Sequence, residues 1–96
     1  MTVFTIAEAN QEFIGSVDYY ESREPGLGLR SRDKVAAVVG RIARFAGLPR
    51  LRRKIYRRVN PQGFHHRDAY IIRSDTIWVV AIAHGHRRPE FWIDRI

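Results

Sequence analysis

Histidine and arginine side chains are the groups in this chain best suited to chemistry. Histidine titrates near neutral pH and can act as an acid or a base, and the arginine guanidinium binds phosphate through two parallel N–H groups. Cleavage of RNA by its own 2′-hydroxyl needs a base, an acid and cations around the phosphate. Because so basic a chain collects these residue types easily, their presence alone does not establish a nuclease. The residues that would carry such a reaction are His84, Arg58, Arg73 and Lys54, with His86, His65, His66, Arg57 and Tyr70 as further options.

The cysteine and histidine content argues against other site chemistries. The chain has no cysteine, which excludes disulfides and thiolate catalysis. It has four histidines, and of these only His84 and His86 are spaced to share one face of a strand, which is too few ligands for a metal site. His65 and His66 are adjacent, so on a strand they point to opposite faces and one of them is expected at the surface. We therefore expect no metal and no cofactor.

The distribution of charge is the most informative feature of the composition. The net charge is +7, and residues 34–67 contain ten basic side chains and no acidic one. A segment this one-sided attracts polyanions or an acidic protein. Arg57 and Arg58 are the best candidates for contact, because charged groups that alternate through a strand are costly if they are buried unpaired. Polyanion or acidic-protein binding is therefore expected of this segment.

The cationic residues are positioned by a central strand expected at residues 77–83. This run is continuously apolar and rich in β-branched residues, which predicts a strand that is covered on both faces. It is followed at once by His84, His86, Arg87 and Arg88. A rigid element that ends in charged side chains fixes their direction, so a functional site is expected there.

Two amphipathic helices precede this strand. Thr5 and Glu8 have the spacing of a capping box, and Pro25-Gly26 breaks the first helix. The second helix is expected from residue 27 or 31 to residue 46, where Gly47 and Pro49 stop it. Both helices have one apolar stripe, formed by Ala9, Phe13, Val17 and Tyr20 in the first and by Val35, Val38, Val39, Ile42 and Phe45 in the second. The helices therefore predict a hairpin that lies on a flat surface.

The remaining segments complete a single domain over residues 1–96. Strands are expected near residues 3–6, at residues 55–59 and at residues 64–73, with a turn at residues 60–63. The order is β-α-α-β-β-β, which predicts an α+β fold with a helical hairpin packed on a mostly antiparallel sheet. Neither a signal peptide nor a membrane helix is indicated, so a cytoplasmic protein without membrane contact is the simplest expectation.

Fragments spread over nearly the whole chain resemble one family. The resemblance is strongest in the order and spacing of these fragments, which are Glu8-Ala9, Tyr19-Tyr20-Glu21, Gly26-Leu27-Gly28, Gly47-Leu48-Pro49, Arg57-Arg58, Phe64, Tyr70, Arg73 and the C-terminal run from Val80 through Arg87-Arg88-Pro89 and Trp92 to Arg95. Together they resemble the RelE/ParE superfamily of bacterial toxins, and its ParE-like branch more closely.

The resemblance implies the toxin of a type II toxin–antitoxin pair, held inactive by a cognate antitoxin. ParE-like members inhibit DNA gyrase and block replication, whereas RelE-like members cut messenger RNA on the ribosome. Fold alone does not choose between these targets. The ribosome-dependent relatives keep a tyrosine near the C-terminus, where this chain has Phe91-Trp92. We therefore expect a non-catalytic gyrase inhibitor, with an mRNA endonuclease as the alternative and a non-toxic nucleic-acid-binding module as the second alternative.

Two further expectations follow from the resemblance. Residues expected to contact the target or the antitoxin are Arg50, Arg52, Arg53, Arg57, Arg58, Arg87, Arg88 and Trp92. The chain also departs from the family pattern at Phe64-His65-His66, where many relatives have Phe-Pro-Tyr, and at Ser31 and Ala46, where Phe and Pro are usual. The last two changes are expected to alter packing in the helical hairpin.

Overall fold

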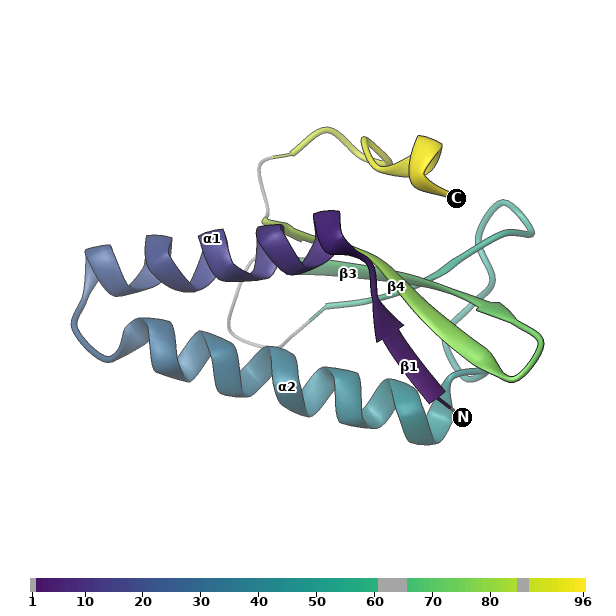
Figure 1. Ribbon diagram of the computed structural model, residues 1–96, viewed down its shortest axis with the longest axis horizontal. Helices are drawn as coiled ribbons and strands as arrows, with labels where there is room; N and C mark the ends of the chain where they lie inside the picture. The colour runs from purple at the N-terminus through teal and green to yellow at the C-terminus, as the bar shows by residue number, and fades with distance from the viewer. Residues whose placement is uncertain (1, 61–65, 85–86) are drawn as a thin grey trace.

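The computed structural model describes residues 2–60, 66–84 and 87–96. The elements follow in the order expected from the sequence, and they form one four-stranded sheet with two long helices (Figure 1). The predicted start of the third strand at Phe64 and most of the turn predicted at residues 60–63 lie outside the described residues. The elements are β1 (Thr2–Thr5), α1 (Ala7–Arg23), α2 (Leu27–Phe45), β2 (Arg57–Val59), β3 (His66–Arg73), β4 (Thr76–His84) and a 3-10 turn, η1 (Ile93–Arg95).

The sheet has the strand order β1-β4-β3-β2. β1 runs parallel to β4, and β2, β3 and β4 are mutually antiparallel where they pair, so the expected mostly antiparallel sheet is confirmed. A β-bulge explains the unbroken apolar run of β4. Tyr70 pairs with Val79 and Ala69 pairs with Ala81, which leaves Val80 as an extra residue on β4. The bulge reverses the alternation of side chains, so Ile77, Val79 and Ile82 all face the helices.

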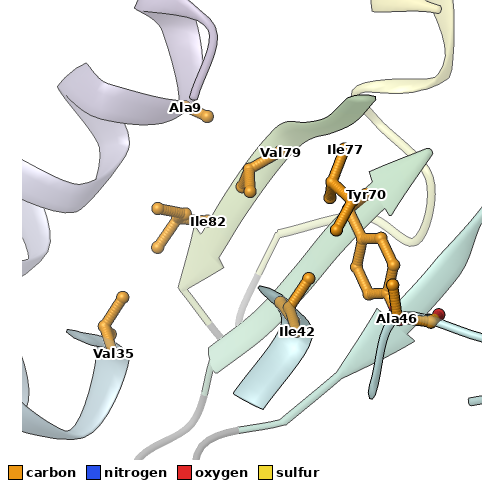
Figure 2. Close-up of a cluster of buried hydrophobic side chains, with 8 residues drawn as sticks. All are labelled: Ala9, Val35, Ile42, Ala46, Tyr70, Ile77, Val79 and Ile82. Carbon is orange, nitrogen blue, oxygen red and sulfur yellow. Dashed lines mark hydrogen bonds between the residues drawn. The ribbon is translucent and has the colours of Figure 1, made fainter. Parts of the chain in front are cut away.

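The sheet is covered on both faces, as the composition of β4 predicts. Between the helical hairpin and the sheet lies a cluster of eight buried residues, which converge from α1, α2, β3 and β4 in Figure 2. On the other face, Ala69, Ile71, Val80 and Ala81 pack with Tyr56 and Trp92. α2 and the C-terminal segment accordingly lie on opposite sides of the strands (Figure 1).

A carboxylate from the last turn of α1 binds the start of α2 and holds the corner of the helical hairpin. The Glu21 side chain accepts hydrogen bonds from the backbone N–H groups of Gly26 and Gly28, at 3.0 Å for the shorter contact to each. Gly26 has a φ of 88°, which favours glycine. A Cβ on Gly28 would lie 2.7 Å from the carbonyl oxygen of Val17, so only glycine allows the two helices to approach this closely.

The start of α1 differs from the expected capping box. Thr5 belongs to β1, and the residue before the helix is Ile6, which makes no side-chain capping hydrogen bond. The backbone N–H of Ile6 instead donates to the carbonyl of Val79 at 3.1 Å. The prediction was wrong because Thr5 is held in the parallel strand pair with Val79, which prevents it from turning back onto the helix. None of the helices in the described ranges is long and apolar enough to cross a membrane.

Candidate functional site

Arginines from three segments surround a small pocket on the face of the sheet that the C-terminal segment covers. Arg58 comes from β2, Arg67 from β3, and Arg87 and Arg88 from the segment after β4. The cavity among them has a volume of about 20 Å³, and Tyr56, Ala83, Pro89, Glu90, Phe91 and Trp92 complete its lining. We call these lining residues the cationic pocket.

The strand register explains why two arginines of the cationic pocket lie together. Arg58 is opposite Ala69 in the antiparallel pair of β2 and β3, and Arg67 is two residues from Ala69 on the same face. Such diagonal neighbours on adjacent strands have Cβ atoms about 7 Å apart, well within the reach of two arginines. Both side chains are partly buried. The sheet therefore holds these two guanidiniums at the floor of the pocket.

The electrostatic environment of Arg58 is strongly positive. Its pKa is lowered, first because the guanidinium is partly buried and then because Arg52, Arg67 and Arg50 are close. Within the described residues, no carboxylate lies within ion-pair distance of any of the four arginines of the cationic pocket. The charge of this surface is therefore not balanced by the described part of the chain.

Glu90, the acidic residue of the pocket, is bound by other groups. Its carboxylate accepts a hydrogen bond from the hydroxyl of Tyr56 and forms an ion pair with Arg53 at 3.0 Å. Burial and this hydrogen bond to Glu90 raise the pKa of Tyr56, so the phenol remains a donor at neutral pH. Glu90 thus fastens the C-terminal segment to the loop before β2.

A second clasp fixes the far end of the C-terminal segment. Arg95 donates to both carboxylate oxygens of Glu12 on α1 and to the carbonyl of Val80, each at 3.0 Å. Glu12 in turn accepts from the backbone N–H of Ile82 at 3.1 Å. Because β1 ends at Thr5, these two β4 backbone groups have no strand partner on that side. The Glu12–Arg95 pair therefore replaces the missing strand and positions the segment that carries Arg87 and Arg88.

A larger hydrophobic groove lies on the opposite face, between the end of α2 and β2. Its volume is about 240 Å³, and it is lined by Val38, Arg41, Ile42, Phe45, Leu48, Pro49, Val59, Asn60 and Tyr70. Tyr70 forms its buried wall, and the Tyr70 hydroxyl donates to the carbonyl of Ala46 at 2.7 Å. Leu48 is 78% exposed and Phe45 is 48% exposed, so the rim presents apolar surface to solvent. Cationic side chains flank this apolar surface, since Arg41 lines the groove and Arg57 donates to the carbonyl of Pro49 at 3.0 Å.

The structure divides the predicted contact residues between these two surfaces. Arg58, Arg87 and Arg88 line the cationic pocket, with Arg50 and Arg52 close to Arg58 and Arg53 paired to Glu90. Arg57 lies on the other face, beside the hydrophobic groove. Trp92 is only 4% exposed and packs edge-on against Tyr56, so it supports the pocket as a core residue and is not an exposed contact.

Two of the residues proposed for RNA cleavage lie far apart in the fold. His84 and Arg73 lie at opposite ends of the hairpin of β3 and β4, since His84 pairs with His66 and Arg73 pairs with Thr76. The two positions are seven steps apart along β3, which corresponds to about 23 Å. Lys54 is exposed in the turn before β2. His65 and His86 lie outside the described residues, and Tyr70 is fully buried, as expected of a core residue.

A buried polar cluster on the hairpin side of β3 was missed by sequence reasoning. His66 is 2% exposed and its Nε2 lies 2.7 Å from the hydroxyl of Ser16 on α1. The expectation that one residue of the His65-His66 pair lies at the surface stays a prediction, because His65 lies outside the described residues. Asp68 is 1% exposed, and burial raises the pKa of its carboxyl to about 7. The sequence did carry a signal for this cluster. His66 and Asp68 lie at alternate positions with Tyr70 and Ile72, so all four face the helical hairpin from the same side of β3.

These features define a small α+β domain with a helical hairpin on one face of a mixed sheet and a cationic pocket on the other. The fold is similar to that of a chain in a solved structure of the "Chromosomal ParDE TA system from P. aeruginosa". The TM-score is 0.79 and the sequence identity is 15%, over 88% of this chain and 95% of the other. The predicted α+β fold, with its strand, helical hairpin and three further strands, is thereby confirmed. By sequence, no family and no curated protein matches the chain.

Proposed function

We propose that this chain is the ParE-like toxin of a type II toxin–antitoxin system, which inhibits DNA gyrase by protein–protein contact in the cytoplasm and is neutralised by a cognate antitoxin. The observation that carries the proposal is the similarity in fold to a chain of a ParDE system over 95% of that chain. The unbalanced positive charge of the surface supports a strongly acidic partner.

The hydrophobic groove is the proposed contact for the antitoxin. An intracellular neutraliser must bind tightly, and tight interfaces combine a buried apolar centre with a polar rim. The groove has this composition, with Ile42, Phe45 and Leu48 at its centre and Arg41 and Arg57 beside it. A segment with apolar anchors and acidic flanks would fill it.

The geometry favours contact over catalysis. General acid–base catalysis requires both groups within hydrogen-bond reach of one reacting centre. His84 and Arg73 are at opposite ends of a hairpin, and Lys54 is exposed in a turn. The mRNA endonuclease therefore remains the alternative to be tested and not the favoured function.

Two assays on the toxin released from its antitoxin test the proposal. One measures DNA supercoiling by gyrase together with cleaved DNA, and the other maps cuts in messenger RNA on translating ribosomes. We expect gyrase inhibition with intact message, and we expect Arg58→Ala to weaken inhibition roughly tenfold, because it removes a charged contact from the pocket.

Arg30→Ala is the matched control, since Arg30 is exposed on α2 and makes one weak ion pair. It should change gyrase inhibition by less than about twofold. Ribosome-dependent cuts that disappear in Arg58→Ala would instead establish the endonuclease.

A further inference from the structure

We propose that the cationic pocket binds a side-chain carboxylate from an acidic segment of a protein partner, with Arg58 and Arg67 as the principal ligands. The inference rests on the proposed function, because it names the chemistry by which a protein partner is recognised at this surface. It adds Arg67, which the sequence did not single out as a contact residue.

The positive charge of the cationic pocket is uncompensated among the described residues. Arg58 and Arg67 extend from adjacent strands toward the same cavity, and Arg87 and Arg88 close it from the C-terminal segment. The described residues supply no carboxylate within ion-pair distance of these four groups, and Glu90 is already bound by Tyr56 and Arg53. Burial first, and then the neighbouring positive charges, lower the pKa of Arg58, and an incoming anion would offset the contribution of those charges.

The cationic pocket is small and its walls are rigid. The space open to a water-sized group is about 20 Å³, enough for roughly one such group, so the pocket takes one polar headgroup at its mouth and not a ring. The walls are held in place, because Trp92 and Tyr56 are buried against each other and the clasp of Arg95 with Glu12 anchors the segment behind them. Arginine presents a planar fork of N–H donors that matches a carboxylate bidentately. A carboxylate is therefore the group that the pocket fits.

The aromatic side chains of the pocket favour an acidic protein over a nucleic acid as the partner. Single-stranded nucleic acid is bound by stacking its bases on free aromatic faces as well as by cations. Here Tyr56 and Trp92 are buried edge to face, and the ring of Phe91 has the guanidiniums of Arg87 at 4.0 Å and Arg95 at 5.2 Å. The aromatic rings of the pocket are thus already packed, so it offers charge without a platform for bases.

A binding measurement with a defined acidic peptide tests the inference. Fluorescein-labelled hexaglutamate is titrated with the purified protein at roughly 25 mM salt, where screening is weak, and anisotropy is recorded. The double variant Arg58→Ala/Arg67→Ala should bind about tenfold more weakly. The control variant Arg30→Ala/Arg32→Ala removes the same charge from exposed positions on α2, and it should bind within about twofold of the parent.

A charge-preserving variant keeps the test informative if the alanine variant folds poorly. Arg58→Lys/Arg67→Lys retains the charge but not the guanidinium fork, and it should lose several-fold in affinity if the carboxylate is held bidentately. Equal weakening in the pocket and control variants would show that the peptide senses only overall charge, and would overturn the inference. So would tighter binding of hexauridylate than of hexaglutamate, if the pocket variant loses that binding.

The inference and the proposed function fail in different ways. If the protein binds hexaglutamate through Arg58 and Arg67 but does not inhibit gyrase, the proposed function is contradicted. The inference that the pocket binds a carboxylate then still holds. A protein that inhibits gyrase but shows no pocket-specific peptide binding would contradict the inference alone.

Discussion

At the scale of single residues, Asp68 is a buried carboxyl in the interface of the sheet with the helical hairpin. It is 1% exposed, and neither carboxylate oxygen has a hydrogen-bond partner among the described residues. His66 lies beside it, with Nδ1 4.0 Å from Oδ1. Desolvation disfavours the charged form, which raises the pKa of Asp68 from 3.8 to about 7.

This raised pKa predicts that the protein loses stability as the pH rises. Below about pH 4 the carboxyl is neutral in both states, and between pH 4 and 7 it ionises only in the unfolded chain, which favours unfolding. We therefore expect Asp68→Asn to be more stable than the parent at pH 8, by on the order of 4 kcal/mol for a pKa raised from 3.8 to about 7, and about as stable as the parent at pH 4. Urea unfolding at both pH values measures this difference.

Asp18→Asn provides the matched control, because Asp18 is exposed on α1. It should follow the pH profile of the parent. If Asp68→Asn also follows that profile, Asp68 has an ordinary pKa in the folded state and the burial argument is incorrect.

At the scale of elements, the pair of Glu12 and Arg95 completes the edge of β4. Its side chains are 14% and 19% exposed, so the pair is shielded from solvent. Glu12→Ala would leave the N–H of Ile82 without its acceptor and Arg95 without its counter-charge. We expect a loss of about 2–3 kcal/mol in the free energy of unfolding.

Urea titration measures this loss, and Glu12→Gln separates its two causes. Glutamine keeps an acceptor for Ile82 and removes the charge, so it should fall between the parent and Glu12→Ala. Because the clasp positions the C-terminal segment, both variants should also weaken hexaglutamate binding. A Glu12→Ala protein as stable as the parent would show that water replaces the clasp without cost.

The packing of the two helices gives a second prediction at this scale. Gly28→Ala would place a Cβ 2.7 Å from the carbonyl oxygen of Val17, a backbone atom that yields only if α1 and α2 separate. We expect a loss of roughly 1–3 kcal/mol, as for other overpacked contacts. Thermal and urea unfolding measure it.

Gly40 is a matched control within the same helix. A Cβ at this exposed position would have nothing within 4 Å, so Gly40→Ala should stabilise α2 by about 0.5–1 kcal/mol. Opposite signs for these two substitutions would support the close approach of the helices. A stabilising Gly28→Ala would contradict it.

At the scale of the whole molecule, the basic segment 34–67 supplies charge to both faces of the sheet. β2 is an edge strand, and its alternation places Arg57 beside the hydrophobic groove and Arg58 in the cationic pocket. Positive charge therefore surrounds one edge of the domain. An acidic partner is attracted to this edge before either surface is engaged, which raises the association rate at low salt.

The sequence by itself determined the order of the elements and the fold class, and it predicted the charge of the partner. Hydrophobic periodicity, the helix stops at Pro25-Gly26 and Gly47, and the apolar run of β4 were sufficient for the element order, because these signals are local. Family fragments in the same order predicted an α+β fold that the structure shares with a chain of a ParDE system. The basic tract predicted an acidic partner, which stays a prediction.

Only the tertiary structure decided which charged groups meet. Arg58 and Arg67 share a pocket because of strand register, and the bulge at Val80 sets which face each β4 side chain occupies. Glu12 and Arg95 are 83 residues apart, and Ser16 and His66 are 50 apart. Such pairings depend on how the chain closes on itself, and a local pattern carries no information about that closure. For the same physical reason His84 and Arg73 looked compatible in the sequence, although they lie at opposite ends of the hairpin of β3 and β4.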